Sequence, residues 1–137
     1  MIEAIRNYFI QCPLIESDGI VGVDYLPPEA TSYAIYAPGD VNGGYIKKWV
    51  GGGGIKQYSF IFASRFDYSP ETVQNIQNSN FYRNLQNWIE QNNKNRILPD
   101  VQGVQKIEVV QTGTLSLVDE SQRLAEYQMI ARLIYDV

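Results

Sequence analysis

The sequence contains no histidine and only one cysteine, Cys12, among its 137 residues. Without an imidazole, the chain has no histidine general base, no Ser-His or Cys-His nucleophile pair and no histidine ligand for a metal ion. A single cysteine forms neither an internal disulfide nor a thiolate zinc site, because both need more than one sulfur atom. Cys12 is therefore predicted to be a small buried side chain. These absences set aside much of enzyme chemistry and favour a binding or assembly protein for which we expect no catalytic residues, no cofactor and no metal.

The chain is also short of positive charge and of long apolar runs. It has 11 basic against 15 acidic residues, whereas nucleic-acid-binding proteins usually carry a basic face. No apolar run reaches the roughly 18 residues of a membrane span. Glu3, Arg6 and Asn7 interrupt the apolar stretch that a signal peptide would need. We expect synthesis in a reducing cytoplasm, no membrane partner and no sequence-specific nucleic-acid partner.

The hydrophobic pattern of the first half predicts one short helix followed by strands. Ile2, Ile5 and Phe9 have the spacing of one face of a helix. Pro13 is expected to end this helix. Strands are expected at residues 32–37, 45–50 and 55–66 because these stretches are rich in aromatic and β-branched residues. In the last of them, alternate aromatic residues predict a half-buried strand. These residues are Tyr58, Phe60, Phe62 and Phe66.

The main helix is predicted to follow. Ser69-Pro70-Glu71 has the N-cap, the proline and the acidic residue that are typical of a helix start. Apolar residues then recur at helical spacing as far as about Lys94. A break is expected at Asn78-Ser79-Asn80, because these residues are poor helix formers. The many Asn and Gln residues between Gln74 and Arg96 are interpreted as a solvated polar face.

The last third of the chain predicts a second hairpin. Residues 104–118, with a bulge at Thr112-Gly113, are expected to pair antiparallel with residues 124–137. The order of strands, helix and hairpin predicts a single α+β domain over residues 1–137. Its helices would pack on one face of a mainly antiparallel (mixed) sheet.

Four consecutive glycines and the aromatic residues around them are the most unusual local feature. Gly51–Gly54 is followed by Ile55-Lys56-Gln57 rather than by the Lys-Ser/Thr pair and helix of a phosphate-binding loop. We interpret the glycines as a flexible hairpin tip. Tyrosine and tryptophan are enriched at protein interfaces, so this hairpin is the predicted contact element. The candidate interface residues are Tyr45, Lys47, Trp49, Gly51, Gly52, Gly53, Gly54 and Lys56.

Several segments, spread in order over nearly the whole chain, resemble one family of small phage proteins. They are Ile5-Arg6-Asn7-Tyr8-Phe9, Cys12-Pro13-Leu14, Val23-Asp24-Tyr25-Leu26-Pro27, Tyr33-Ala34-Ile35-Tyr36, Ile46-Lys47-Lys48-Trp49-Val50, Phe60-Ile61-Phe62-Ala63-Ser64-Arg65, Gln74-Asn75-Ile76, Phe81-Tyr82, Trp88, Gln105-Lys106-Ile107-Glu108-Val109 and Tyr127-Gln128. The family is that of the tail terminators, encoded among the minor capsid and tail-completion genes of Firmicutes phages and prophages. No single segment is diagnostic, and the resemblance is carried by the collection.

The resemblance implies an α+β protomer that forms a ring, commonly a hexamer, on the head-proximal end of the tail tube. Such a ring ends tube polymerisation and offers a surface to the head-side connector protein. In tail-like bacteriocins, which have no head, the ring simply caps the particle. The implied partners are other copies of the chain, the tail tube protein and, in a contractile tail, the sheath. The implied location is the virion or tail-like particle, after synthesis in the cytoplasm of the bacterial host.

Two alternatives stay open. One is a head-completion or neck (connector) protein of similar size. The other is a small carboxylate-based enzyme, because two carboxylates can act together as acid and base. The candidate acids Asp18, Asp24, Asp40 and Asp119-Glu120 lack the regular spacing of a calcium loop, and they lie in stretches where turns are expected.

Overall fold

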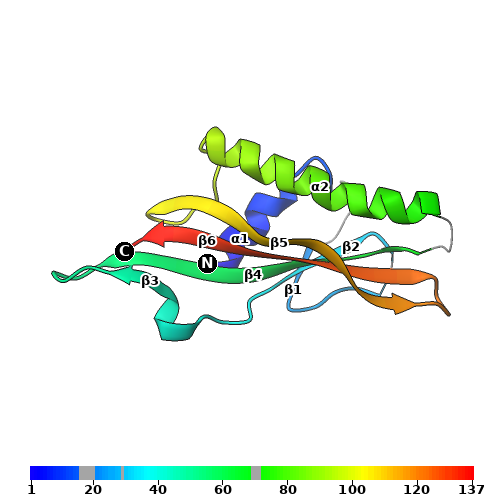
Figure 1. Cartoon of the computed structure of the whole chain (residues 1–137), viewed down its shortest axis with the longest axis horizontal. Helices are drawn as coiled ribbons and strands as arrows, with labels where there is room; N and C mark the ends of the chain where they lie inside the picture. The colour runs from blue at the N-terminus through cyan, green and yellow to red at the C-terminus, as the bar shows by residue number, and fades with distance from the viewer. Residues whose placement is uncertain (16–20, 29, 69–71) are drawn as a thin grey trace.

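A computed structural model of the 137-residue chain describes all residues except 16–20, 29 and 69–71. It is an α+β fold in which two α-helices pack against a six-stranded mixed sheet (Figure 1). The elements in chain order are α1 (Ile2–Ile10), β1 (Val21–Val23), β2 (Ser32–Tyr36), the short 3-10 helix η1 (Val41–Gly44), β3 (Tyr45–Lys48), β4 (Gly54–Asp67), α2 (Thr72–Lys94), β5 (Val104–Asp119) and β6 (Leu124–Asp136). The predicted fold class is confirmed.

The strand order of the sheet is β1-β2-β4-β6-β5, and only the β1–β2 pair is parallel. Strand β3 pairs with the first residues of β4, on the edge of β4 that β2 occupies farther along. Both predicted hairpins, β3–β4 and β5–β6, are therefore confirmed. One consequence is that β5 forms an edge of the sheet, and β3 also keeps one unpaired side.

The core lies on one face of the sheet and is rich in aromatic residues. Phe60 and Phe62 of β4 are fully buried beneath α1, where the ring of Phe9 lies 4.9 Å from that of Phe62. Tyr82 of α2 contacts the same face, with its ring 6.4 Å from that of Phe62. Burying each such side chain contributes roughly 1.5–3 kcal/mol. The alternation of aromatic residues along β4, from which this buried face was predicted, thus also provides the surface on which both helices pack. Cys12 is buried, as predicted.

Helix α2 is continuous through Asn78-Ser79-Asn80, so the predicted break is wrong. The side chain of Asn78 donates to the backbone oxygen of Asp67 at 2.9 Å and lies 3.4 Å from the Tyr127 hydroxyl. Because its amide finds partners outside the helix, it does not compete with the helical backbone. Asn92 is likewise buried and donates to the Tyr8 hydroxyl at 3.3 Å. The expected polar face is therefore wrong for these two residues, and the predicted helix start at Ser69-Pro70-Glu71 lies outside the described residues.

The predicted bulge in β5 is confirmed and has a packing role. The pairing of β5 with β6 shifts register between Gln111 and Thr114. At this point the ring of Tyr82 lies so close to Gly113 that a Cβ atom there would overlap it. The Tyr82 hydroxyl hydrogen-bonds with Ser64 Oγ at 2.6 Å and donates to the Tyr127 backbone oxygen at 3.2 Å. Gly113 thus lets α2 approach β5 closely enough for these buried bonds.

Candidate protein interface

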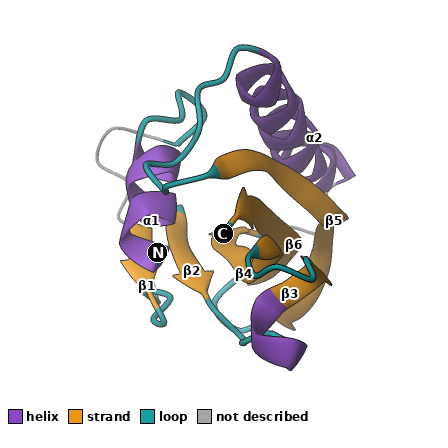
Figure 2. Ribbon diagram, turned by 90° about the vertical axis from the view of Figure 1, so that its left-hand side faces the viewer, coloured by secondary structure: helices purple, strands orange, loops and turns teal. Residues whose placement is uncertain are grey.

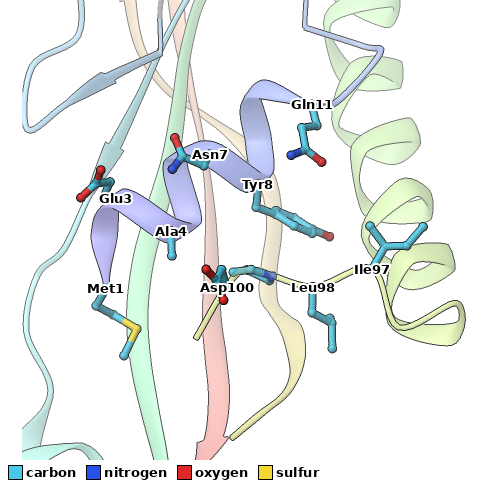
Figure 3. A pocket seen from close by; sticks show the side chains of 10 residues that line it. Met1, Glu3, Ala4, Asn7, Tyr8, Gln11, Ile97, Leu98 and Asp100 are labelled. Atoms are coloured by element: carbon cyan, nitrogen blue, oxygen red, sulfur yellow. The ribbon is translucent and has the colours of Figure 1, made fainter. Parts of the chain in front are cut away.

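A cavity of about 420 Å³ lies between α1 and the segment that joins α2 to β5 (Figure 3). Its lining residues are Met1, Glu3, Ala4, Asn7, Tyr8, Gln11, Ile97, Leu98, Pro99 and Asp100. Burial raises the pKa of the Tyr8 hydroxyl to about 12, so Tyr8 is neutral and able to donate a hydrogen bond at ordinary pH. The cavity therefore offers carboxylates, amides and a phenol rather than a nucleophile beside a base.

Two of the carboxylates singled out in the sequence, Asp40 and Asp119, accept hydrogen bonds within turns and between segments. Asp40 accepts hydrogen bonds from the Ser59 backbone N–H at 2.9 Å and from Gln57 Nε2 at 3.0 Å. Asp119 accepts from the Ser121 hydroxyl at 2.6 Å, and the hydrogen bonds from Ser121 and Gln122 lower its pKa. Asp18 lies outside the described residues. Within the described part of the chain, no three His, Cys, Asp or Glu side chains are grouped so that they could share a metal ion.

Asp40 is also one end of a series of hydrogen-bonded side chains that crosses the helix-free face of the sheet. Gln57 donates to Asp40 and accepts a hydrogen bond from Arg132 Nη1 at 2.7 Å. Arg132 in turn donates to Glu108 at 3.0 Å. The chain of contacts therefore links the segment before η1 to β4, β6 and β5 in turn.

The β3–β4 hairpin brings the predicted interface residues together. Tyr45 lies beside Lys48 and Lys56, whose Nζ atoms are 4.6 Å and 4.7 Å from the centre of its ring. The Nζ atom of Lys47 lies 4.8 Å from the centre of the Trp49 ring. At these distances an ammonium is attracted to an aromatic face, by about 0.5–1 kcal/mol at an exposed site. These contacts form two groups at this end of the sheet, Tyr45 with Lys48 and Lys56, and Trp49 with Lys47.

Lys48 lies beside Tyr45 in these contacts, but it was not among the predicted residues. Strict alternation would place Tyr45 and Lys47 on one face of β3 and Lys48 on the other. A register shift between Tyr45 and Lys47 changes this arrangement, because Tyr45 pairs with Lys56 while Lys48 pairs with Gly54. The shift therefore puts Lys48 on the same face as Tyr45, and alternation alone could not have found it.

The four glycines of the tip have two different environments. A Cβ at Gly53 would collide with the backbone oxygen of Val137, and a Cβ at Gly54 with that of Lys47. By contrast, Gly51 and Gly52 have no atom within 4 Å of where a Cβ would stand. The first pair lets β3, β4 and the end of β6 approach one another closely, and the second pair forms the exposed turn.

Apolar side chains around this hairpin are exposed. Trp49 is 47% exposed, Val50 is fully exposed, and Ile46 is 46% exposed. Beside them lies an open hollow of about 400 Å³ lined by η1 and β3. Together with Val41, Tyr45, Lys47, Lys48 and Lys56, these residues form what we call the hairpin surface. It projects on the side of the sheet away from α2 (Figure 2).

No family model, curated protein or solved structure matches this chain. No helix among the described residues is both long enough and apolar enough to cross a membrane. The geometry of the hairpin surface and the sequence resemblance are therefore what support a function.

Proposed function

We propose that the protein is a tail terminator that forms a ring, with six copies as the expected number, on the end of a phage tail tube or tail-like particle. The observation that carries this proposal is the hairpin surface. It exposes the apolar side chains of Trp49, Val50 and Ile46, and aromatic residues are enriched at protein interfaces. Exposed apolar clusters of this kind mark binding sites on otherwise soluble domains.

The proposed action needs surfaces and no chemistry. A ring of identical protomers that covers the last layer of the tube occupies the surface on which the next layer would add. Closed symmetry then leaves no equivalent surface for further growth. The opposite side of the ring is free to bind a head-side connector protein or, in a headless particle, to end the structure. In a contractile tail the sheath would be a further partner.

Tail length is the direct test. A particle-producing strain that lacks the gene is complemented with the unchanged chain or with Trp49→Ala combined with Val50→Ser. We expect overlong tails without the gene and with the double variant, because the cap fails to bind. The matched control is Ile76→Ser on α2, which removes a side chain that is 53% exposed but lies outside the hairpin surface. It should restore normal length.

Other outcomes would contradict the proposal in distinct ways. Normal tails with unattached heads in the strain that lacks the gene would support a head-completion or neck protein instead. Normal, complete particles in that strain would remove both structural functions and leave the carboxylate-based enzyme to be tested. Normal tail length with the Trp49 and Val50 variant would show that the hairpin surface is not the contact.

A further inference from the structure

The free edge of β5 is closed along its first part by side chains from the end of α2. Asn93 Nδ2 donates to the Ile107 backbone oxygen at 2.7 Å, and the Ile107 N–H donates to Asn93 Oδ1 at 3.1 Å. Arg96 donates to the backbone oxygen of Gln105 at 2.8 Å. An asparagine amide that both donates to and accepts from one residue replaces a neighbouring strand at that point. This part of the edge is therefore not open to a partner.

The remaining part of the edge, residues 109–118, has no such cover among the described residues, and we call it the distal edge. Val110, Leu115 and Leu117 are exposed there by 59%, 50% and 57%. The stretch contains no charged residue and no proline. Exposed edge strands usually carry such residues, because an uncharged apolar edge invites another strand to pair with it. A stretch of this composition is typical of an edge that is covered in the assembled protein.

Among the described residues, one side of β3 is also unpaired, and it lies at the opposite end of the long axis of the molecule from the distal edge (Figure 1). Lysines are gathered at one of the two ends, which also carries Asp40, Glu108 and Asp136. All five lysines of the chain lie toward the β3 end, where β4 and β5 begin and α2 ends: Lys47, Lys48, Lys56, Lys94 and Lys106. The turn that follows the distal edge carries Asp119 and Glu120 against one arginine, Arg123.

We propose that the distal edge of one copy pairs with the β3 edge of the next copy, head to tail. The two edges lie at opposite ends of one sheet, so they meet only between different molecules. Opposite charge would steer the lysines of β3 toward the acidic turn beside the distal edge. A contact between two different surfaces of the same chain is heterologous, and repeated contacts of this type form a ring when the rotation between successive copies closes a full turn, and an open filament when it does not. This inference rests on the proposed ring and specifies what covers part of its hairpin surface.

Cysteine cross-linking of the purified chain tests this contact. In a Cys12→Ala background, Lys48→Cys and Leu117→Cys are made separately, and one of the two carries a mass tag. Mild oxidation of an equimolar mixture should give about tenfold more tagged–untagged dimer than a mixture of Lys48→Cys with the control Ile76→Cys. The reason is that docking raises the effective thiol concentration to about millimolar. Equal yields in the two mixtures would overturn the proposal. Efficient dimerisation of Leu117→Cys alone would overturn it in favour of edge-to-edge pairing between two β5 strands.

A charge exchange gives a second readout that loss of folding would not imitate. Lys48→Glu alone and Glu120→Lys alone should each lower the cross-linking yield, now measured between thiols at Ile46→Cys and Leu117→Cys. The chain with both charge changes should recover the yield, because the opposite charges face each other again. No recovery, with both chains folded, would contradict the proposed orientation.

The cross-linking result and the tail-length result separate the two proposals. Head-to-tail cross-links together with normal tails in the strain that lacks the gene would keep this contact and reject the terminator function. Overlong tails in that strain, without head-to-tail cross-links, would keep the function and reject this contact.

Discussion

The aromatic ring of Tyr82 on α2 lies directly against the backbone of Gly113 on β5. The two residues are 31 positions apart and belong to different layers of the fold. Their close approach brings the Tyr82 hydroxyl to Ser64 and to the backbone of Tyr127. A glycine in a strand interior, which usually weakens a sheet, is thus what allows the helix to pack on it.

Gly113→Ala should therefore destabilise the protein. The added methyl group has to displace the ring of Tyr82, and overpacking of this kind costs about 1–3 kcal/mol. Urea unfolding followed by circular dichroism measures the change. Gly51→Ala is the matched control, because nothing lies within 4 Å of its Cβ position, and it should change the free energy of unfolding by less than about 0.5 kcal/mol. Equal effects of the two substitutions would contradict the packing role of Gly113.

Tyr82→Phe should also lower the free energy of unfolding, because it leaves buried Ser64 Oγ without its hydroxyl partner. The loss of a buried hydrogen bond that leaves one group unsatisfied costs about 1–3 kcal/mol. Ser64→Ala and the double variant complete a mutant cycle. We expect the double variant to be less destabilised than the sum of the two single changes. Additive effects would show that the Ser64–Tyr82 bond contributes nothing of its own.

Alkaline pH should destabilise the protein partly through Tyr8. Burial raises its pKa to about 12 in the folded protein, from the ordinary value of 10.0 for a tyrosine. The folded state therefore binds the phenolic proton more tightly than the unfolded state does. The contribution of Tyr8 to the free energy of unfolding is fully present below pH 10, and it is lost as the pH rises toward 12. Each pH unit in that window costs up to about 1.4 kcal/mol from this residue.

Tyr8→Phe tests that pH dependence. Although it also removes the contact with Asn92, the readout is the slope of the free energy of unfolding against pH above pH 10, not its absolute value. We expect a shallower slope in the variant. Burial raises the pKa of Tyr82 as well, so part of the loss of stability at alkaline pH should persist in the variant. An unchanged slope would show that Tyr8 titrates normally in the folded protein.

Asn93→Ala should increase self-association by uncovering the backbone of Ile107. Without the amide, the first part of the β5 edge becomes continuous with the distal edge, and a longer open edge pairs more readily with other chains. Light scattering and sedimentation of the purified variant should show larger species than the unchanged chain gives at the same concentration. The control is Asn87→Ala, an exposed position of the same helix. Identical behaviour of both variants would indicate that Asn93 does not guard the edge.

The parts of the fold that could be predicted from the sequence are those set by local periodicity. Alternating aromatic residues in β4 and the turn residues around Gly51–Gly54 were sufficient to predict a hairpin and its buried face. The start of the Thr72–Lys94 helix lies next to residues outside the description, so its predicted cap stays a prediction.

The features that sequence reasoning missed depend on distant partners or on local irregularity. Asn78 keeps α2 unbroken because its amide is satisfied by Asp67, 11 residues away, and no helix propensity contains that information. Lys48 lies beside the Tyr45 ring because of a shift in strand register. The open stretch of β5 was likewise invisible, because it depends on which side chains of α2 reach the edge. The predicted interface residues Tyr45, Lys47, Trp49 and Lys56 do come together, but their binding role stays a prediction.

The hydrogen-bonded side chains from Asp40 through Gln57 and Arg132 to Glu108 bear on the size of the proposed ring. They act as a brace across the helix-free face and hold the hairpin end of the protomer in a fixed orientation relative to β5. In a head-to-tail ring, each subunit is rotated by the same angle relative to its neighbour. The copy number of a closed ring is therefore a full turn divided by that angle. A stiff protomer selects one copy number, whereas a pliable one would allow several. The brace would thus set the diameter of the cap, and with it the tube that the cap fits.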